Sequence, residues 1–326
     1  MKSNRTIATQ LTRIALLVAL SSVACARQAL PWGCEGHETV ALIAEKHLNA
    51  NALQHVTDLL KNNPIDPHLH RFCKNGGADL MADASTWADD ERDVRKDTAP
   101  WHFLDIPRGT PQTKAADFCP STTGCVTSAL NDQINVLKAG GSNQQTADAL
   151  RFIIHFVGDL HQPLHCTTNN DRGGNCVPVA FFARNPRITD SQKESYSPNL
   201  HAVWDTDIVK KTAGQLTTEE FALLLDHQFV SQIAAWQQES VNLDDWAWES
   251  HQEAEQVAYG KLPKKIKIEA PAVVVSCSDD NHVSTRMAKL HERLGNPYQA
   301  AASKIVKERL AKAGIRLAMI LNEVWP

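Results

Sequence analysis

Apolar residues recur at helical spacing along most of the chain. The pattern is clearest in residues 147–160, and it predicts further helices over residues 37–49, 217–236 and 297–323. Residues 173–199 differ, because their apolar residues stand among proline, glycine and serine, which favours a short hairpin or a long loop. The chain has no internal repeat and no long linker. We therefore expect a mainly α fold, in a single compact domain of many helices.

One of these expected helices carries an unusual polar stripe. In residues 147–160, His155 and Asp159 lie one turn apart and nearly opposite the apolar stripe, between aromatic residues. An ordinary amphipathic helix would carry Lys or Glu there. Pro163 should end the helix, so that His165 follows on the exit loop. This H-x3-D-x5-H pattern predicts two metal-binding side chains on the helix and a third just beyond it.

Similar residue types recur elsewhere in the chain. They are His201 and Asp205, again spaced H-x3-D, together with Asp89, His102 and His37. An isolated pair of this kind is more often a local ion pair or a feature of the helix surface, and several of the 14 histidines fit that description: His47, His55, His227, His251 and His291. The joint occurrence of the other residues favours a metal site, because imidazole and carboxylate are what zinc binds when thiolates are absent. Such mixed shells leave open positions for water, which suits hydrolysis.

The charge balance limits how the protein can bind a substrate. The 326 residues include 33 Lys or Arg and 37 Asp or Glu, which gives a formal charge of −4. The first 31 residues hold four of the basic side chains and no acidic one, so the remainder carries −8. This excludes a broad basic face of the kind that holds nucleic acid through its phosphates. It does not exclude a nucleic acid or another phosphate ester as a substrate.

Residues 1–31 are typical of an export signal. Three basic residues precede or flank an apolar stretch over residues 14–23, and Ala24 and Ala26 are small residues of the kind that a signal peptidase reads. The stretch is too short to span a bilayer, and no second segment could do so. We expect a secreted or periplasmic protein with no membrane span. Lipid attachment at Cys25 is the alternative.

Seven cysteines follow Cys25, and export would place them in an oxidising compartment where disulfides form. Short intervening loops favour two local bridges, and a third pair is a further candidate: Cys119–Cys125, Cys166–Cys176 and Cys34–Cys73. The odd number leaves one free thiol, which we expect to be Cys277. The chain has no C-x-x-C pair, which argues against a thiolate zinc site or a thioredoxin-like redox centre.

Several stretches of the sequence resemble the zinc-dependent S1/P1 nuclease family, and we expect a bacterial member. They are WGCEGHETVALIA, ASTWADDER, PWHFLDIP, ALRFIIHFVGDLHQPLH and NLHAVWDTD, in the family's order. The resemblance covers residues 32–325, because GIRLAMILNEVW also looks like the family's final helix. It implies one zinc hydrolase domain over residues 32–326, with the mainly helical fold of the phospholipase C/P1 nuclease type.

The resemblance also implies a cluster of three zinc ions held by nine residues. The first ion would be held by Trp32, through its terminal amine and carbonyl, with His37 and Asp159; the second by Asp89, His102, His155 and the bridging Asp159; the third by His165, His201 and Asp205. A water between such ions has a lowered pKa and is a hydroxide near neutral pH, while the ions neutralise charge on the phosphate.

The substrate implied by the resemblance is single-stranded DNA or RNA, or a 3′-nucleotide, and the product carries a 5′-phosphate. Arg92 matches a family arginine near the site and would act with Asp89 and Asp159 by holding a phosphate oxygen. Phe103 would stack a base, and Asp105 would accept hydrogen bonds from the edge of that base. A packing role for Phe103 and a plain surface role for Arg92 are the alternatives. We expect a monomer.

The start of the mature chain departs from the family pattern. Trp32 can offer an amine only as the first residue, yet Pro31 is a poor residue for a signal peptidase to cut after. Cleavage after Ala26 would leave RQALP in front of the tryptophan. We expect a second trimming step that exposes Trp32, the alternative being a weakened site.

Two rival functions remain open. Zinc-dependent phospholipase C shares the architecture, but the short spacing between Trp32 and His37, and the aspartate at position 205, speak against it. A non-catalytic exported zinc-binding protein would be expected to carry flexible His-rich tracts, and the sequence has none.

Overall fold

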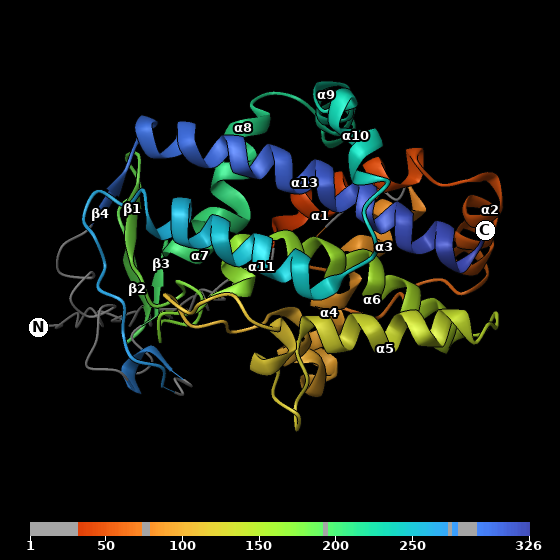
Figure 1. The fold of residues 1–326 in the computed structure, drawn as a ribbon, viewed down its shortest axis with the longest axis horizontal. Helices are drawn as coiled ribbons and strands as arrows, with labels where there is room; N and C mark the ends of the chain where they lie inside the picture. The colour runs from red at the N-terminus through yellow and green to blue at the C-terminus, as the bar shows by residue number, and fades with distance from the viewer. Residues whose placement is uncertain (1–31, 74–78, 192–194, 273–275, 280–291) are drawn as a thin grey trace, which may run out of the picture.

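The computed structural model describes residues 32–73, 79–191, 195–272, 276–279 and 292–326. Helices dominate these residues, and the few short strands gather at one end of the molecule (Figure 1). The expectation of a mainly α, single compact domain is confirmed. The expected export signal over residues 1–31 lies outside the described residues, so it stays a prediction.

The helical elements follow one another with short connections. The α-helices are α1 (Gly33–Lys46), α2 (Ala50–Asn62), α3 (Leu80–Ser85), α4 (Trp87–Val94), α5 (Val126–Lys138), α6 (Gln144–His161), α7 (Leu200–Ala202), α8 (Ile208–Ala213), α9 (Thr218–Gln228), α10 (Val230–Trp236), α11 (Leu243–Glu253) and α13 (Asn296–Val324). Short 3₁₀ turns cover Lys96–His102 (η1), Ala115–Phe118 (η2), Pro163–Cys166 (η3) and Cys277–Asp279 (η6), and π-helical segments cover Val203–Asp207 (η4) and Ala254–Tyr259 (η5).

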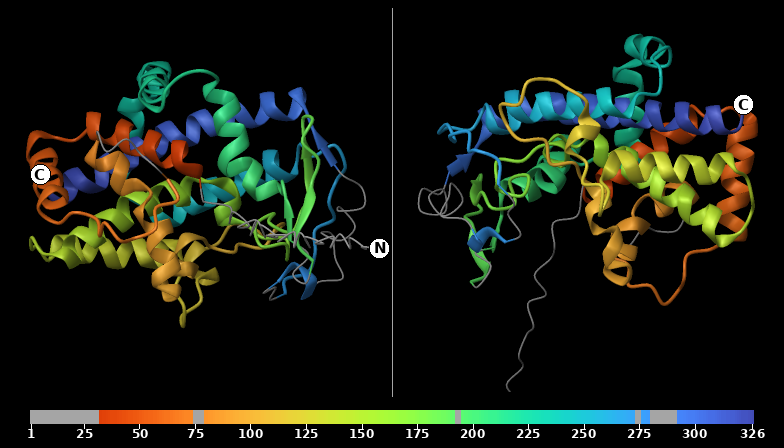
Figure 2. Two further views of the ribbon diagram at one scale, coloured as in Figure 1. Left: turned by 180° about the vertical axis from the view of Figure 1, so that it is seen from behind. Right: turned by 60° about the horizontal axis from the view of Figure 1, so that its bottom comes forward.

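Helix α6 lies in the middle of the bundle. It contacts α1, α3, α4, α5, α11 and α13, and all its residues from 149 to 161 are buried. The long α13 runs across the molecule in all three views, close to α1 (Figures 1 and 2). The polar stripe of α6 therefore faces other protein elements instead of solvent, which explains why His and Asp stand where a surface helix would carry Lys or Glu.

The ends of the predicted helices differ from the observed ones by a few residues. Helix α1 begins at Gly33, four residues before the predicted start. Thr217 and Glu220 form a capping box at the start of α9, but the helix is not continuous to residue 236 as predicted. It stops at Gln228, and Phe229 adopts non-helical backbone angles before α10 begins. No breaking residue marks this position, so the apolar pattern gave no sign of it.

Residues 173–199 form the expected irregular segment with a hairpin. Strands β2 (Arg187–Asp190) and β3 (Ser195–Ser197) pair antiparallel within it. A third strand from the same segment, β1 (Val179–Phe181), pairs parallel with β4 (Glu292–Leu294). Local sequence did not predict this second pairing, because its partner lies more than a hundred residues further along the chain.

Three disulfides join six of the seven described cysteines. Cys34–Cys73 and Cys119–Cys125 are as predicted, whereas the predicted bridge from Cys166 to Cys176 is wrong. Cys176 pairs with Cys277, so Cys277 is not the free thiol. Cys166 is free and buried, because it ends the turn after α6 with its sulfur directed toward the Leu160 carbonyl in the core. Among the described residues, no helix is long and apolar enough to cross a bilayer.

Candidate metal centre

Residues from several helices and turns converge beside the central helix. They are Trp32, which precedes α1, His37 from α1, Asp89 from α4, His102 at the end of η1, His155 and Asp159 from α6, His165 from η3, His201 from α7, and Asp205 from the π-helical segment η4. All nine are buried, and the most exposed of them, His201, has only 9% of its surface accessible to solvent. The structure therefore brings together every residue that the sequence predicted as a metal ligand.

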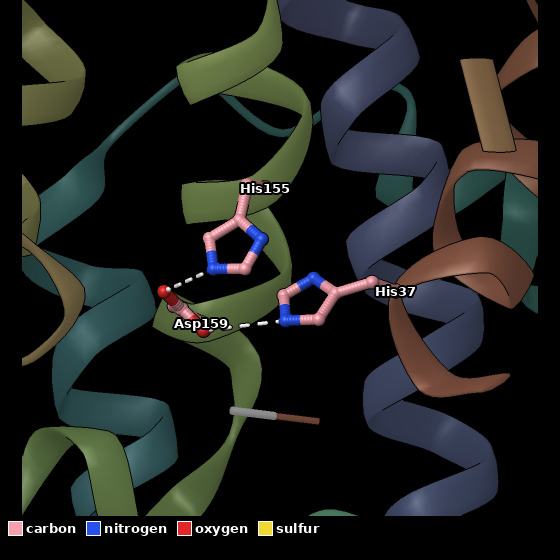
Figure 3. A group of neighbouring side chains, drawn as sticks. All are labelled: His37, His155 and Asp159. Carbon is pink, nitrogen blue, oxygen red and sulfur yellow. Dashed lines mark ion pairs between the residues drawn. The ribbon is translucent and has the colours of Figure 1, made fainter. Parts of the chain in front are cut away.

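These side chains form three adjoining groups in which the candidate ligand atoms lie within 4.8 Å of one another. The groups are His37 with His155 and Asp159, Asp89 with His102 and His155, and His165 with His201 and Asp205. Asp159 lies at the junction: its carboxylate is 3.0 Å from His102 Nδ1, 3.1 Å from His155 Nε2, 3.4 Å from His165 Nδ1 and 3.5 Å from His37 Nε2. Figure 3 shows this carboxylate directed toward the rings of His155, from the same helix, and His37, from α1.

Backbone carbonyls fix the orientation of three of the imidazoles. Each Nδ1 atom donates a hydrogen bond to a main-chain oxygen. His155 donates to the Ser85 carbonyl (2.7 Å), His165 to the His102 carbonyl (2.8 Å) and His201 to the Gly173 carbonyl (2.7 Å). Because a carbonyl oxygen only accepts, each Nδ1 must carry a proton, so a metal ion would bind each ring at Nε2. Metal-binding histidines commonly show this arrangement. The protein thus presents three preset nitrogen ligands.

Many polar atoms of the three groups have no hydrogen-bond partner. Of the twelve such buried side-chain atoms among the described residues, seven belong here: both ring nitrogens of His37, Nε2 of His102 and His165, and one oxygen each of Asp89, Asp159 and Asp205. Buried polar atoms are normally satisfied, so a concentration of exceptions needs an explanation. Cations bound at the three groups would satisfy the three carboxylate oxygens and one nitrogen of each of these histidine rings.

Burial sets the protonation of the histidine rings. It lowers the pKa of His37 to about 4 and that of His102 and His201 to about 3, so these rings are neutral near pH 7, as metal ligands must be. Burial alone would also lower the pKa of His155, but Asp159 and Asp89 raise it to about 9.

The carboxylates of the site repel one another without a cation to separate them. Burial raises the pKa of Asp89 to about 7 and that of Asp205 well above its usual range, and Asp159 adds to both shifts. Burial would raise the pKa of Asp159 as well, but His155 and His165 hold it well below its usual range. Three buried aspartates in one place are costly unless positive charge is bound there.

Trp32 reaches the same site through its main chain. Its side chain is fully buried, its backbone N–H donates to the Asp205 carboxylate, and α1 starts at the next residue. The nitrogen of Trp32 therefore already lies at the candidate metal-binding groups, next to Asp205 of the third of them.

A family model described as S1/P1 Nuclease matches residues 32–326, which include every residue named in the site. The chain belongs to the S1/P1 nuclease family. The family predicted from the sequence motifs, and with it a nuclease, is thus confirmed.

Named relatives agree with this membership. The chain is 29% identical to Endonuclease 4 of Arabidopsis thaliana over 309 residues, which cover 91% of this chain and 90% of the plant protein. It is 29% identical to Nuclease S1 of Aspergillus oryzae over 208 residues, 61% of this chain and 62% of the fungal protein. It is 31% identical to Nuclease P1 of Penicillium citrinum over 189 residues, 56% and 60% of the two chains.

The residues predicted to bind substrate lie where the buried groups meet solvent. Arg92 contacts Asp89 at 3.4 Å and keeps 18% of its side chain exposed. Phe103 directly follows the buried His102 and is 40% exposed, so it does not pack in the core. Asp105 also reaches solvent, yet the protein around it, with the charge of Asp171, raises its pKa to about 6.

Sequence reasoning missed the residues that support the ligands. The carbonyls of Ser85 and Gly173 leave no mark in a single sequence, and neither does Gln162, whose amide contacts Asp205. Gly158 did carry a signal, since an isolated glycine inside a helix often marks a close approach. Two of the histidines that were not predicted to bind metal have other partners in the structure. His47 pairs with Asp226, and His55 stacks on Trp325.

Proposed function

We propose that this protein is a secreted or periplasmic zinc-dependent phosphodiesterase, which acts as a monomer on single-stranded DNA, RNA and 3′-nucleotides and leaves 5′-phosphate products. One observation carries the proposal: three adjoining, buried His/Asp groups share the Asp159 junction in a chain that belongs to a nuclease family. The disulfides and the absence of a membrane-spanning helix among the described residues support the location.

The donor set fits three zinc ions, since zinc takes neutral imidazole and carboxylate ligands. We assign the first ion to Trp32, His37 and Asp159, the second to Asp89, His102, His155 and Asp159, and the third to His165, His201 and Asp205. When bound, such ions would lower the pKa of a water molecule and neutralise negative charge on the phosphate.

The chain's own side chains would hold and orient the substrate. The guanidinium of Arg92, steadied by Asp89, would donate to a phosphate oxygen. Phe103 offers an exposed ring beside the buried groups on which an unpaired base can stack, and Asp105 would accept hydrogen bonds from that base. A double helix hides the base faces that this arrangement needs, so single strands are the expected substrate.

The proposed first ion requires a free amine at Trp32, and we propose that trimming before this residue completes the site. Trp32 directly precedes α1, which carries His37, and its nitrogen contacts Asp205, which supports the proposal because cleavage would create the amine beside the candidate ligands. N-terminal sequencing of the active exported form should give a chain that begins at Trp32. An active form that begins at Arg27 would contradict it.

The function is tested with four substrates. Correctly processed, zinc-loaded protein is assayed on single-stranded DNA, RNA, a 3′-nucleotide and phosphatidylcholine, before and after chelation and after zinc is restored. We expect chelation to stop hydrolysis of the nucleic acids and zinc to restore it, with 5′-phosphate ends in the products. Turnover of phosphatidylcholine alone would favour the phospholipase, and no turnover at all would favour a zinc-binding protein without catalysis.

A further inference from the structure

The carboxamide of Gln162 is held between the main chain and one of the candidate metal ligands. Gln162 is fully buried at the end of α6. Its Oε1 accepts a hydrogen bond from the Leu164 backbone N–H at 2.5 Å, and its Nε2 donates to Asp205 Oδ1 at 2.6 Å. A backbone N–H can only donate, so the amide oxygen must face Leu164. The NH2 group is therefore committed to Asp205.

The backbone that carries this amide is itself fixed. The Gln162 N–H donates to the Asp159 carbonyl, and the Gln162 carbonyl accepts from the His165 N–H. The two preceding carbonyls are also bound, that of Leu160 by the Ser250 hydroxyl and that of His161 by the Arg309 guanidinium. Gln162 thus lies in a hydrogen-bonded turn between Asp159 and His165.

This contact gives the two oxygens of Asp205 different tasks. Oδ1 accepts the Gln162 amide, whereas Oδ2 lies 3.4 Å from His201 Nε2 and has no hydrogen-bond partner. An unanchored carboxylate could rotate and offer either oxygen. With Oδ1 held, Oδ2 remains on the side of His201, while Oδ1 lies 3.8 Å from His165 Nε2, so both histidines of the third group face this carboxylate.

We propose that Gln162 is the positioning residue of the third metal site: its amide holds the Asp205 carboxylate so that one oxygen stays directed at a cation bound by His165 and His201. The inference rests on the proposed function, because it assumes that this group binds zinc. Partners that orient a metal ligand typically change metal affinity by about 10–100-fold when they are lost.

The experiment measures zinc binding rather than turnover. Wild type, Gln162→Leu and Gln162→Glu are stripped with chelator, titrated with Zn2+ alone against a competing chromophoric chelator, and analysed for bound zinc per chain. Gln162→Leu keeps the size of the side chain but removes the donor. Gln162→Glu keeps the shape but sets a carboxylate against Asp205. In both variants we expect zinc affinity to fall by about 10–100-fold at one site, the third, while the affinities of the other sites stay as in wild type.

Gln299→Leu is the matched control. Gln299 is another buried glutamine, but its amide donates to Ile208, Thr212 and Ser303, away from the metal-binding groups. Its loss should lower the thermal unfolding temperature in chelator as the Gln162 variants do, with zinc binding unchanged. If wild type binds zinc and the Gln162 variants bind it equally well, this inference alone is overturned. Wild type that takes up no zinc would overturn the proposed metal centre, and this inference with it.

Discussion

Gly158 and His37 lie so close together that no side chain fits between them. A Cβ atom built on Gly158 would stand 2.7 Å from His37 Nδ1, closer than such atoms come in proteins. The glycine precedes Asp159 in the last turn of α6, and within a helix alanine is otherwise favoured over glycine by about 1 kcal/mol. Its presence there lets α1 bring His37 against the junction carboxylate.

Replacement of this glycine should therefore damage the metal centre. In Gly158→Ala, the added methyl would push the His37 ring away from Asp159, and overpacking should cost about 1–3 kcal/mol of unfolding free energy. We expect zinc affinity at the His37 group to fall by about 10-fold or more. Chelator competition and denaturant unfolding measure the two effects.

The control for this substitution is Gly295→Ala. Gly295 precedes α13 and has an ordinary negative φ, and a Cβ added to it would meet open space, with no contact within 4 Å. An alanine there should leave zinc binding unchanged and alter stability by less than about 1 kcal/mol. If both alanine variants bound zinc like the wild type, the close approach of Gly158 to His37 would have no role at the site.

The Asp159→Asn variant tests the junction of the three groups. Asparagine keeps the shape but removes the charge that neighbours His37, His102, His155 and His165. We expect hydrolysis of single-stranded DNA to fall by at least about 100-fold and the number of bound zinc ions per chain to fall as well. Kinetics on zinc-saturated protein, with metal analysis of the same samples, checks both. A variant with the wild-type rate would refute the assignment of the bridge.

The candidate ligand side chains could be predicted from the sequence far better than the backbone groups that orient them. His155, Asp159 and His165 were recognisable because one helix period and one proline place them together, and the family motifs supplied the rest. The carbonyls that orient His155 and His201 come from Ser85 and Gly173, which chain folding brings near from 70 and 28 residues away. Such partners leave no local pattern, because any residue type has a carbonyl.

The disulfide error has a similar cause. Cys166 and Cys176 are near in sequence, but the turn after α6 buries Cys166 in the core, while the loop that follows carries Cys176 toward Cys277. Local spacing favours short loops, since they are easy to close. Local spacing cannot predict a bridge to a cysteine 101 residues further along the chain, such as that from Cys176 to Cys277. For the same reason the pairing of β1 with β4 was not predicted.

The observed disulfides predict unequal losses of stability. The Cys176–Cys277 bridge closes a separation of 101 residues and Cys119–Cys125 one of 6. By the loop-entropy relation, Cys277→Ser should lower the unfolding free energy by about 4–5 kcal/mol and Cys119→Ser by about 2 kcal/mol. Denaturant unfolding in the presence of chelator measures both. An equal effect of the two substitutions would show that loop length does not govern their contributions.

The loss of stability in acid should depend on Glu249. Its carboxylate lies 2.7 Å from both Arg309 and Arg316 and 3.0 Å from Lys312. Burial would raise the pKa of Glu249, but these cations, Arg316 foremost, lower it far below its usual value. A carboxyl with a lowered folded-state pKa stabilises the protein above its unfolded pKa of about 4.3, and this stabilisation is lost as pH falls further.

Glu249→Gln should therefore lower the unfolding free energy at pH 7 by about 2–4 kcal/mol, since the buried Arg309 and Arg316 both lose a charged partner and only Arg316 keeps another, Glu239. It should also flatten the decline of stability below about pH 4.5, because the titrating group is gone. Unfolding of the metal-free protein from pH 3 to pH 7 tests this. Glu323→Gln, which removes an exposed partner of Lys138, is the control and should leave the acid profile unchanged. A profile for Glu249→Gln that runs parallel to wild type would contradict the assignment.

The exposed ring of Phe103 should contribute to substrate binding and not to folding. It is 40% exposed although its neighbour His102 is buried in the metal-binding groups. In Phe103→Ala, loss of base stacking should weaken binding of a single-stranded oligonucleotide by about 1–3 kcal/mol, which is about 5- to 150-fold in Kd. Leu223→Ala, which truncates an apolar side chain that is 53% exposed on α9, is the control and should change neither affinity nor stability. Titration of the zinc-loaded protein with a non-hydrolysable strand measures the affinity. An unchanged Kd together with a loss of stability in Phe103→Ala would make this ring a packing residue instead.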